Sequence, residues 1–229
     1  MSLKYEPYDQ RGYPTVDVRE GYRRWSEHYD GDVSEDLDVH LLERLETVTW
    51  AVDRAVDLAC GTGRIGAWLA ARGARAVTGV DLTPEMVERA RARGVYDQVL
   101  LEDVRATSLP EHAADLVVNV LSIEHLPELA PFYGEVARLL GTGGTAVVIG
   151  FHPHFLLSGI PTHFKADGVK VAIENTIHLF ADHVTAARRA RLALRELSER
   201  VVDPDWVARA PGYHRHVGRP VSFAMVWSA

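Results

Sequence analysis

Between residues 55 and 151 the chain alternates between two patterns of apolar positions. Short apolar runs, typical of buried parallel strands, cover 55–59, 76–80, 98–101, 115–121 and 145–151. The segments between them carry apolar residues at helical spacing, and Thr83-Pro84 starts one of these as a cap followed by a proline. Five strands alternating with helices predict right-handed crossovers and a doubly wound parallel sheet.

The segments before and after this core have different patterns. Ser34 is expected to cap a helix whose apolar positions are Leu37, Leu41, Leu42, Leu45 and Val48. Residues 152–180 contain prolines and glycines around one short strand at 169–173, which predicts an insertion over the sheet.

The end of the chain predicts one helix and two strands. Asp182 is expected to cap a helix that ends near Arg191. The segments 192–202 and 221–227 then alternate in polarity. Strands so close together along the chain predict an antiparallel edge on the sheet.

Composition narrows the class of protein. The chain has 229 residues, of which 47% are apolar and 25% charged, as expected of a globular domain. Its net charge of −7 disfavours a nucleic-acid partner, because gripping a phosphate backbone requires clustered Lys and Arg. A single cysteine, Cys60, excludes an internal disulfide framework. Without a secretory h-region or an apolar run of membrane-spanning length, the sequence predicts a cytoplasmic protein with no membrane partner.

The stretch AVDLACGTGRIG at residues 55–66 joins the first strand to a helix, and Gly61, Gly63 and Gly66 spell GxGxxG. A glycine turn at this place brings backbone N–H groups close to a ligand. Asp81 ends the second strand, twenty residues after Gly61, where a carboxylate accepts both hydroxyls of a ribose. These features fit NAD and S-adenosylmethionine equally.

Two further acids distinguish the two ligands. Asp57 ends the first strand, where it would repel a dinucleotide pyrophosphate but suit the amino group and sulfonium of S-adenosylmethionine. Asp103 follows the third strand, where its side chain would accept from an adenine amino group beside the backbone of Val104. A dehydrogenase therefore stays an alternative with Asp57 against it.

The chain resembles the class I S-adenosylmethionine-dependent methyltransferases over residues 55–151. The motifs that carry the resemblance stand in the family's order: VDLACGTGRIG, TGVDLTPEMVERAR, LLEDVRATSLP, ADLVVNVLSIEHL and LLGTGGTAVVIG. The resemblance implies S-adenosyl-L-methionine as the cofactor. It places Asp57, Gly61 and Gly63 around the methionine part, Asp81 on the ribose, and Asp103 with Val104 at the adenine. Met86 would pack on the adenine face, Leu82 and Leu121 complete the candidate set, and Gly66 becomes a close-packing residue.

The N-terminal segment resembles the aromatic helix that covers the methionine end of the cofactor in many members of this family. Tyr22, Trp25 and Tyr29 follow one another at i, i+3 and i+7. They are expected to form a cofactor lid, and a plain packing stripe is the alternative.

Methyl transfer is an in-line displacement, and holding the reactants close and aligned in a dry site supplies most of the catalysis. Histidines near the carboxyl edge of the sheet are the candidate bases: His125 after the fourth strand, and His152 and His154 after the fifth. Proximity alone, with no fixed base, is the alternative. No metal is expected, because no paired carboxylates accompany His152, His154 and His163 at ligand spacing.

Together these features predict an α/β fold with a Rossmann-like, doubly wound, mostly parallel seven-stranded sheet whose last strand is antiparallel. One domain, 1–229, would comprise an N-terminal helical cap (1–50), a cofactor-binding half (51–151), a substrate-covering insertion (152–180) and a C-terminal helix with antiparallel strands (181–229).

The apolar and aromatic insertion predicts a small-molecule methyl acceptor, as in natural-product biosynthesis, that takes the methyl group on O, N or an aromatic C. A protein or RNA substrate and a non-catalytic binding module are the alternatives. A homodimer stays open.

Overall fold

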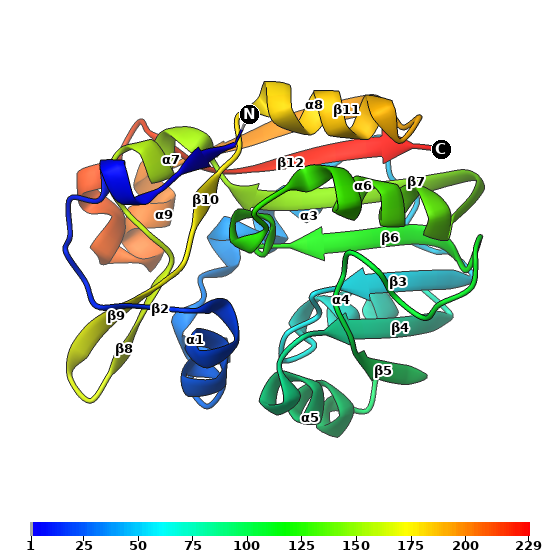
Figure 1. The fold of residues 1–229 in the computed structure, drawn as a ribbon, viewed down its shortest axis with the longest axis horizontal. Coiled ribbons are helices and arrows are strands. Elements are labelled where there is room, and N and C mark those ends of the chain that lie inside the picture. Colours follow the sequence, from blue (N-terminus) through cyan, green and yellow to red (C-terminus); the bar gives the residue numbers. More distant parts are fainter. Residues whose placement is uncertain (1) are drawn as a thin grey trace.

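The computed structural model describes residues 2–229 and has a seven-stranded sheet at its centre (Figure 1). The strand order is β11-β12-β7-β6-β3-β4-β5. Only β12 runs against the others, since it pairs antiparallel with both of its neighbours. The predicted fold class is therefore confirmed. The strands are β3 (Arg54–Leu58), β4 (Ala76–Asp81), β5 (Gln98–Leu101), β6 (Ala114–Val120), β7 (Leu140–Phe151), β11 (Ala193–Val201) and β12 (Pro220–Ser228).

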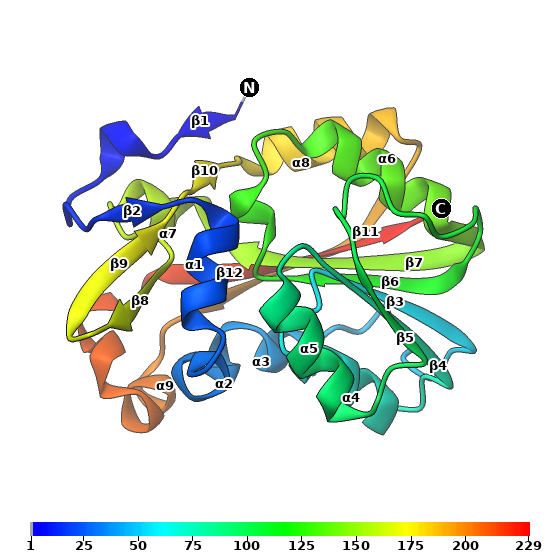
Figure 2. The same cartoon turned by 60° about the horizontal axis from the view of Figure 1, so that its bottom comes forward.

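Helices cover both faces of this sheet (Figure 2). On one face α6 (Leu129–Leu139) and α8 (Phe180–Arg189) bury Phe132, Tyr133 and Ala187 in one core. On the other face α3 (Val39–Leu42), α4 (Arg64–Ala71) and α9 (Pro204–Arg209) bury Leu42, Leu69 and Trp206 in a second core. The helix α5 (Pro84–Arg93) packs against β4 and β5. Within residues 2–229, no helix combines the length and apolar character needed to cross a bilayer.

The N-terminal segment and the insertion pair with each other beside the main sheet (Figure 2). The short strands β1 (Leu3–Lys4) and β2 (Thr15–Val16) pair with β10 (Thr176–Ile177) and β9 (Val169–Ile173), and β9 also pairs with β8 (His163–Ala166). The helix α1 (Val18–Trp25) follows β2 and lies so close to β9 that a Cβ on Gly21 would stand 2.6 Å from Ile173. The strand expected at 169–173 is confirmed.

The single helix predicted from Ser34 through Val48 is wrong. Ser34 caps only the short 3-10 helix η2 (Glu35–Leu37), and α3 ends at Leu42. Asp38 interrupts the helix because its own carboxylate accepts from the backbone N–H of Val39, at 2.6 Å, and starts a new helix there. Helical spacing of leucines does not register such a local competitor.

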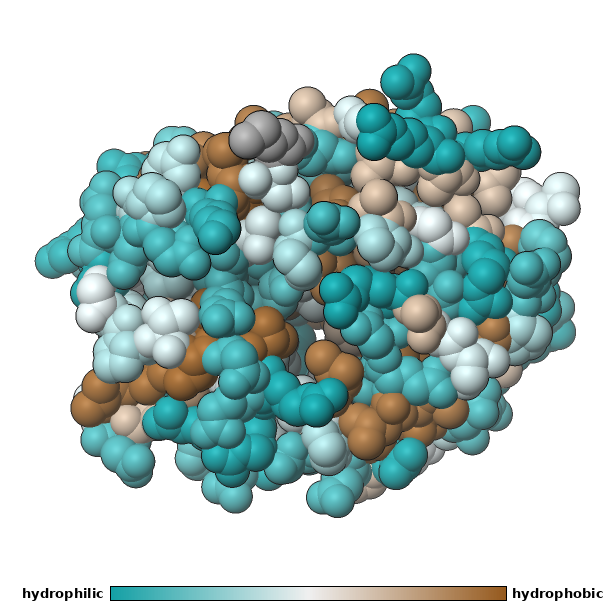
Figure 3. Space-filling model, viewed as in Figure 1, coloured by the Kyte–Doolittle hydropathy of each residue, from teal (hydrophilic) through white to brown (hydrophobic). Residues whose placement is uncertain are grey.

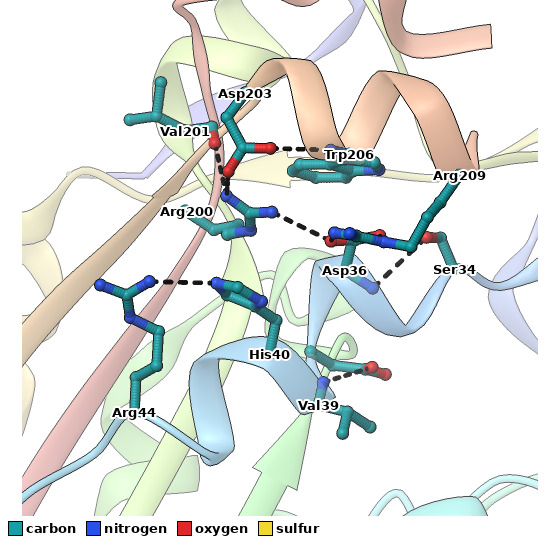
Figure 4. A network of polar contacts seen from close by, with 11 residues as sticks. Ser34, Asp36, Val39, His40, Arg44, Arg200, Val201, Asp203, Trp206 and Arg209 are labelled. Carbon is teal, nitrogen blue, oxygen red and sulfur yellow. Dashed lines mark hydrogen bonds and ion pairs between the residues drawn. The ribbon is translucent and has the colours of Figure 1, made fainter. Parts of the chain in front are cut away.

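A buried ion-pair network anchors this N-terminal segment to the C-terminal half of the chain (Figure 4). Asp36 accepts from Nη2 of Arg200 at 2.9 Å and from Nε of Arg209 at 3.0 Å. The same Arg200 donates to Asp203 at 2.6 Å, and its guanidinium lies 4.8 Å from the ring centroid of Trp206. Both terminal nitrogens of the Arg200 guanidinium thus bind carboxylates, as a buried charge requires, while its Nε has no hydrogen-bond partner among residues 2–229.

Two other elements, α8 and β7, begin at residues different from those predicted. Asp182 is the third residue of α8 rather than its cap, and its carboxylate accepts from the backbone N–H of Leu179, the residue at the cap. The strand expected at 145–151 begins earlier, because α6 ends at Leu139 and β7 already begins at Leu140.

Close packing explains the third glycine of the turn at 61–66. Gly63, with φ of +88°, precedes α4 in the left-handed conformation that glycine adopts most readily. A Cβ on Gly66 would stand 2.2 Å from the hydroxyl oxygen of Tyr96, and this hydroxyl donates to Asp57 at 2.7 Å. The close-packing prediction for Gly66 is confirmed.

Replacing Gly66 with alanine should therefore destabilise the protein, by about 1–3 kcal/mol, because the added methyl group would displace Tyr96 from Asp57. Gly134→Ala is the matched control, since Gly134 lies inside α6 with no atom within 4 Å of a built Cβ. This control should gain about 0.5–1 kcal/mol from higher helix propensity. Urea unfolding of both variants measures the difference, and a stabilised Gly66→Ala variant would contradict the packing argument.

Candidate active site

The carboxyl ends of β3, β4, β5 and β6 meet at one edge of the sheet, and a cavity of about 220 Å³ lies there. We call it the strand-edge cavity. Figure 3 shows the corresponding face hollowed near its centre, with hydrophobic residues along the edge of the hollow. The structure brings nine of the predicted cofactor residues to its wall: Tyr22, Tyr29, Gly61, Asp81, Leu82, Met86, Asp103, Val104 and Leu121.

Three of the predicted cofactor residues lie outside this wall: Trp25, Asp57 and Gly63. Asp57 is only 1% exposed, and its carboxylate accepts from Tyr96. Burial raises the pKa of Asp57 to about 7, while the bond from Tyr96 opposes that shift. Its observed contact is with a side chain that packs against the glycine turn.

Asp81 connects two turns at the cavity floor. One carboxylate oxygen accepts from the backbone N–H of Gly61 at 2.8 Å, and the other accepts from that of Thr83 at 2.9 Å. Burial raises the pKa of Asp81, although both backbone bonds favour its charged form. Each oxygen keeps a further acceptor site for a ligand hydroxyl.

Asp103 also lines the cavity, beside Arg105. Two charge-assisted bonds join them, from Nε to Oδ1 at 2.9 Å and from Nη2 to Oδ2 at 2.6 Å. The guanidinium of Arg105 lowers the pKa of Asp103, so this carboxylate is an anion at neutral pH. Met86 and Val104 supply apolar surface in the same cavity.

Two strained residues line the cavity. Ala59 after β3 and Leu121 after β6 have φ of 60° and 53°, a left-handed conformation that costs a side chain roughly 1–2 kcal/mol. No pattern of apolar positions signals positive φ at an alanine or a leucine. The cavity residues missed by sequence reasoning are Val18, Ala59, Thr83, Arg105, Val120, Ser122, Leu126 and Pro127.

The three aromatic residues expected to form a cofactor lid pack together as one cluster, and their role as a lid stays a prediction. The ring of Trp25 stacks on Tyr22 at 6.0 Å and meets Tyr29 edge-on at 4.9 Å. Tyr29 belongs to α2 (Tyr29–Asp32), where Asp30 accepts from Thr62 of the glycine turn and pairs with Arg93. These contacts fasten the aromatic cluster to the turn.

His125 is hydrogen-bonded to Tyr22 of this aromatic cluster. Its Nε2 lies 2.9 Å from the hydroxyl of Tyr22, and its Nδ1 lies 2.7 Å from the carbonyl oxygen of Glu174. A carbonyl only accepts, so Nδ1 carries the proton and Tyr22 donates to Nε2. Removal from water lowers the pKa of His125 to about 4, which keeps the imidazole neutral at physiological pH.

A second cavity, of about 290 Å³, shares Tyr22, Tyr29 and Leu121 with the first. We call it the aromatic cavity because seven of its wall residues are aromatic: Tyr22, Trp25, Tyr29, Phe151, Phe155, Phe164 and Tyr213. Most of these come from the N-terminal segment and the insertion. Trp25 thus lines the aromatic cavity rather than the strand-edge cavity.

The other two candidate bases lie apart from both cavities. His152 uses Nε2 to bind Glu199 at 2.7 Å, and its Nδ1 accepts from the backbone N–H of His154. These bonds cap α7 (Pro153–Leu157), while the side chain of His154 is exposed. Their catalytic role stays a prediction, and neither side chain is part of the wall of the two cavities.

Glu124 is a buried acid that sequence reasoning passed over. Its side chain is 1% exposed, and among residues 2–229 neither carboxylate oxygen has a hydrogen-bond partner. Burial raises the pKa of Glu124 to about 7, and its charge raises the pKa values of both Tyr22 and Tyr29. No cluster of three or more potential metal ligands occurs in the described part of the chain.

The three kinds of comparison with known proteins each match methyltransferases. A family model described as a methyltransferase domain matches residues 56–148. A methyltransferase named GfsG, from Streptomyces halstedii, is 25% identical over 73% of this chain and 62% of its own length. A ubiquinone biosynthesis O-methyltransferase from Xanthomonas oryzae is 29% identical over 73% of this chain and 75% of its own. An S-adenosylmethionine-dependent methyltransferase structure from Mesorhizobium loti superposes with a TM-score of 0.68 at 21% identity, covering 85% of this chain and 98% of that one.

The raised pKa of Glu124 predicts a pH-dependent loss of stability. An unfolded chain releases this proton near pH 4.5 and the folded chain near pH 7, so folding stability falls as pH rises through that window. Glu124→Gln removes the effect, and the variant should gain about 2–3 kcal/mol relative to wild type between about pH 5 and pH 8. Urea unfolding at both pH values, with exposed Glu128→Gln as the control, measures this. A constant difference between Glu124→Gln and wild type would refute the assignment.

Proposed function

Since the chain belongs to the class I S-adenosylmethionine-dependent methyltransferases, we propose that it methylates O, N or an aromatic C of a small organic molecule held in the aromatic cavity. The observation that carries this proposal is the shared wall of Tyr22, Tyr29 and Leu121 between the two cavities. Such a wall allows an acceptor and a methyl donor to meet while both are enclosed. The relative from Xanthomonas oryzae is named for O-methylation of a small molecule, which supports this reading.

The donor set of the strand-edge cavity fits S-adenosylmethionine. Asp81 offers acceptors for ribose hydroxyls, Asp103 offers an acceptor for an adenine amino group, and Met86 offers an apolar face. When bound, the cofactor supplies a methyl carbon on a positively charged sulfonium. The match of residues 56–148 to a methyltransferase family model supports this cofactor over the nicotinamide of a dehydrogenase.

The chain itself contributes position and a route for a proton. Tyr22, Tyr29 and Leu121 line both cavities, so they would hold a donor and an acceptor close together. The Tyr22 hydroxyl gives its proton to Nε2 of the neutral His125 while its own oxygen accepts the proton of an acceptor hydroxyl. His125 therefore acts through Tyr22, and the backbone carbonyl of Glu174 fixes its tautomer.

We further propose a cytoplasmic location, the absence of a nucleic-acid partner and a natural-product role. A homodimer stays a prediction.

Removing the Asp103 carboxylate should weaken binding of S-adenosylhomocysteine, the demethylated product, by at least about ten-fold, or roughly 1.4 kcal/mol. Asp81 is a less clean target, because its loss would also release the turns at Gly61 and Thr83. Calorimetry of Asp103→Ala beside Glu88→Ala tests this, since Glu88 is an exposed acid on α5. Equal affinities in both variants would exclude Asp103 from the cofactor site.

Tyr22→Phe should lower the turnover of a hydroxyl acceptor by about a hundred-fold while affinity for S-adenosylhomocysteine stays within about three-fold. The reason is that the ring still packs but no longer passes a proton to His125. Tyr29→Phe is the control, because Tyr29 lines the same two cavities without a histidine partner for its hydroxyl among residues 2–229. Transfer of a labelled methyl group to a panel of small phenols, acids and amines gives the rates. Equal losses in both variants would leave proximity as the source of catalysis.

A further inference from the structure

A third cavity, of about 360 Å³, adjoins the aromatic cavity and shares Phe155, His163, Lys170 and Tyr213 with it. We call it the basic mouth. Its wall combines three segments that are distant along the chain: 11–13 before β2, the β8–β9 hairpin, and η4 (Pro211–His216). The charged or titratable residues in this wall are Arg11, His163, Lys170, His214, Arg215 and His216.

The basic mouth contains no acidic residue in its wall. Across residues 2–229, Arg11, Lys170 and Arg215 form no ion pair with a carboxylate, whereas Arg64, Arg138 and Arg200 each do. The acid next to Arg11 in sequence, Asp9, accepts from the backbone N–H groups of Arg11 and Gly12. In a chain of net charge −7, three cations without acidic partners around one opening are a local reversal of charge.

Two histidines of the mouth, His163 and His216, respond to the same charges. Burial lowers the pKa of His163, and the neighbouring Lys170 and Arg11 lower it further. Burial lowers the pKa of His216, and Arg219, Arg11, His214 and Arg215 add to that shift. No carboxylate opposes these effects, and Nζ of Lys170 lies 3.3 Å from Nε2 of His163. The mouth therefore has a positive potential, and the lowered pKa values of His163 and His216 favour their neutral forms.

We propose that the methyl acceptor is an organic anion, with an apolar or aromatic body in the aromatic cavity and a carboxylate or phosphate in the basic mouth. This inference rests on the proposed function and adds the chemical class of the acceptor to it. The basic mouth and the aromatic cavity share four wall residues and so adjoin each other, and we expect one molecule to extend from the wall at Tyr22 toward the cations at Lys170 and Arg215. The wall of the aromatic cavity contains the acid Asp32. Its carboxylate accepts a hydrogen bond from the indole N–H of Trp25 at 2.8 Å, so this acid already has a partner within the protein.

The test uses the protein saturated with S-adenosylhomocysteine and a series of aromatic carboxylates of increasing length: benzoate, cinnamate and 2-naphthylacetate. Each acid is paired with its primary amide, and phenyl phosphate and free inorganic phosphate form two further arms. The variant Lys170→Gln/Arg215→Gln removes two mouth cations. Arg188→Gln/Arg189→Gln is the matched control, because it removes two exposed cations of α8 and gives the same net charge.

We expect at least one acid to bind about ten-fold or more tightly than its amide, and to lose that advantage in the mouth variant but not in the control. Phenyl phosphate binding more tightly than benzoate would identify phosphate as the preferred group, and the reverse would identify carboxylate. If no anion binds more tightly than its neutral partner, or if both double variants lose affinity equally, the proposal is wrong. Intact affinity for S-adenosylhomocysteine would then leave the proposed function standing, whereas its absence in wild type would overturn the proposed function instead.

Discussion

The carboxylate of Asp81 holds together the two turns on which the strand-edge cavity is built. It accepts from Gly61 after β3 and from Thr83 before α5, so the glycine turn and the helix that carries Met86 keep a fixed spacing. Burial makes the charged form costly, and the two backbone N–H groups offset that cost. Left-handed Ala59 and Leu121 add strain at the same edge, as is common where a fold is shaped for a ligand.

Local signals predicted the sheet and its order of elements. The nearly continuous apolar run at 115–121 marks a strand buried on both faces, and Thr83-Pro84 marks a helix start without help from distant residues. The helix expected after Ser34 failed because Asp38 caps its own successor and Asp36 turns toward Arg200. The two-residue strands β1 and β2 carry no periodic signal at all, since partners in the insertion define them.

Residues of the site could be predicted where a single sequence motif contains them. They could not be predicted where segments distant along the chain come together. Asp81 ends β4 and Asp103 stands two residues after β5, so their place at the sheet edge follows from the sequence. Tyr96, which binds Asp57, comes from a loop that no motif marks. The net charge of −7 also concealed the basic mouth, because a sum over the chain does not show that Arg11, Lys170 and Arg215 converge.

The position of helix α1 between the two cavities bears on which step of the catalytic cycle limits the rate. Tyr22 of α1 lines both cavities. Gly21 of the same helix packs against Ile173 of β9, which belongs to the insertion that contributes to the wall of the aromatic cavity. A movement of α1 that opens the strand-edge cavity to a nucleoside would therefore also change the wall of the aromatic cavity. Exchange of the spent nucleoside and departure of the methylated product then pass through one shared opening event, which makes that event a candidate for the slowest step of the cycle.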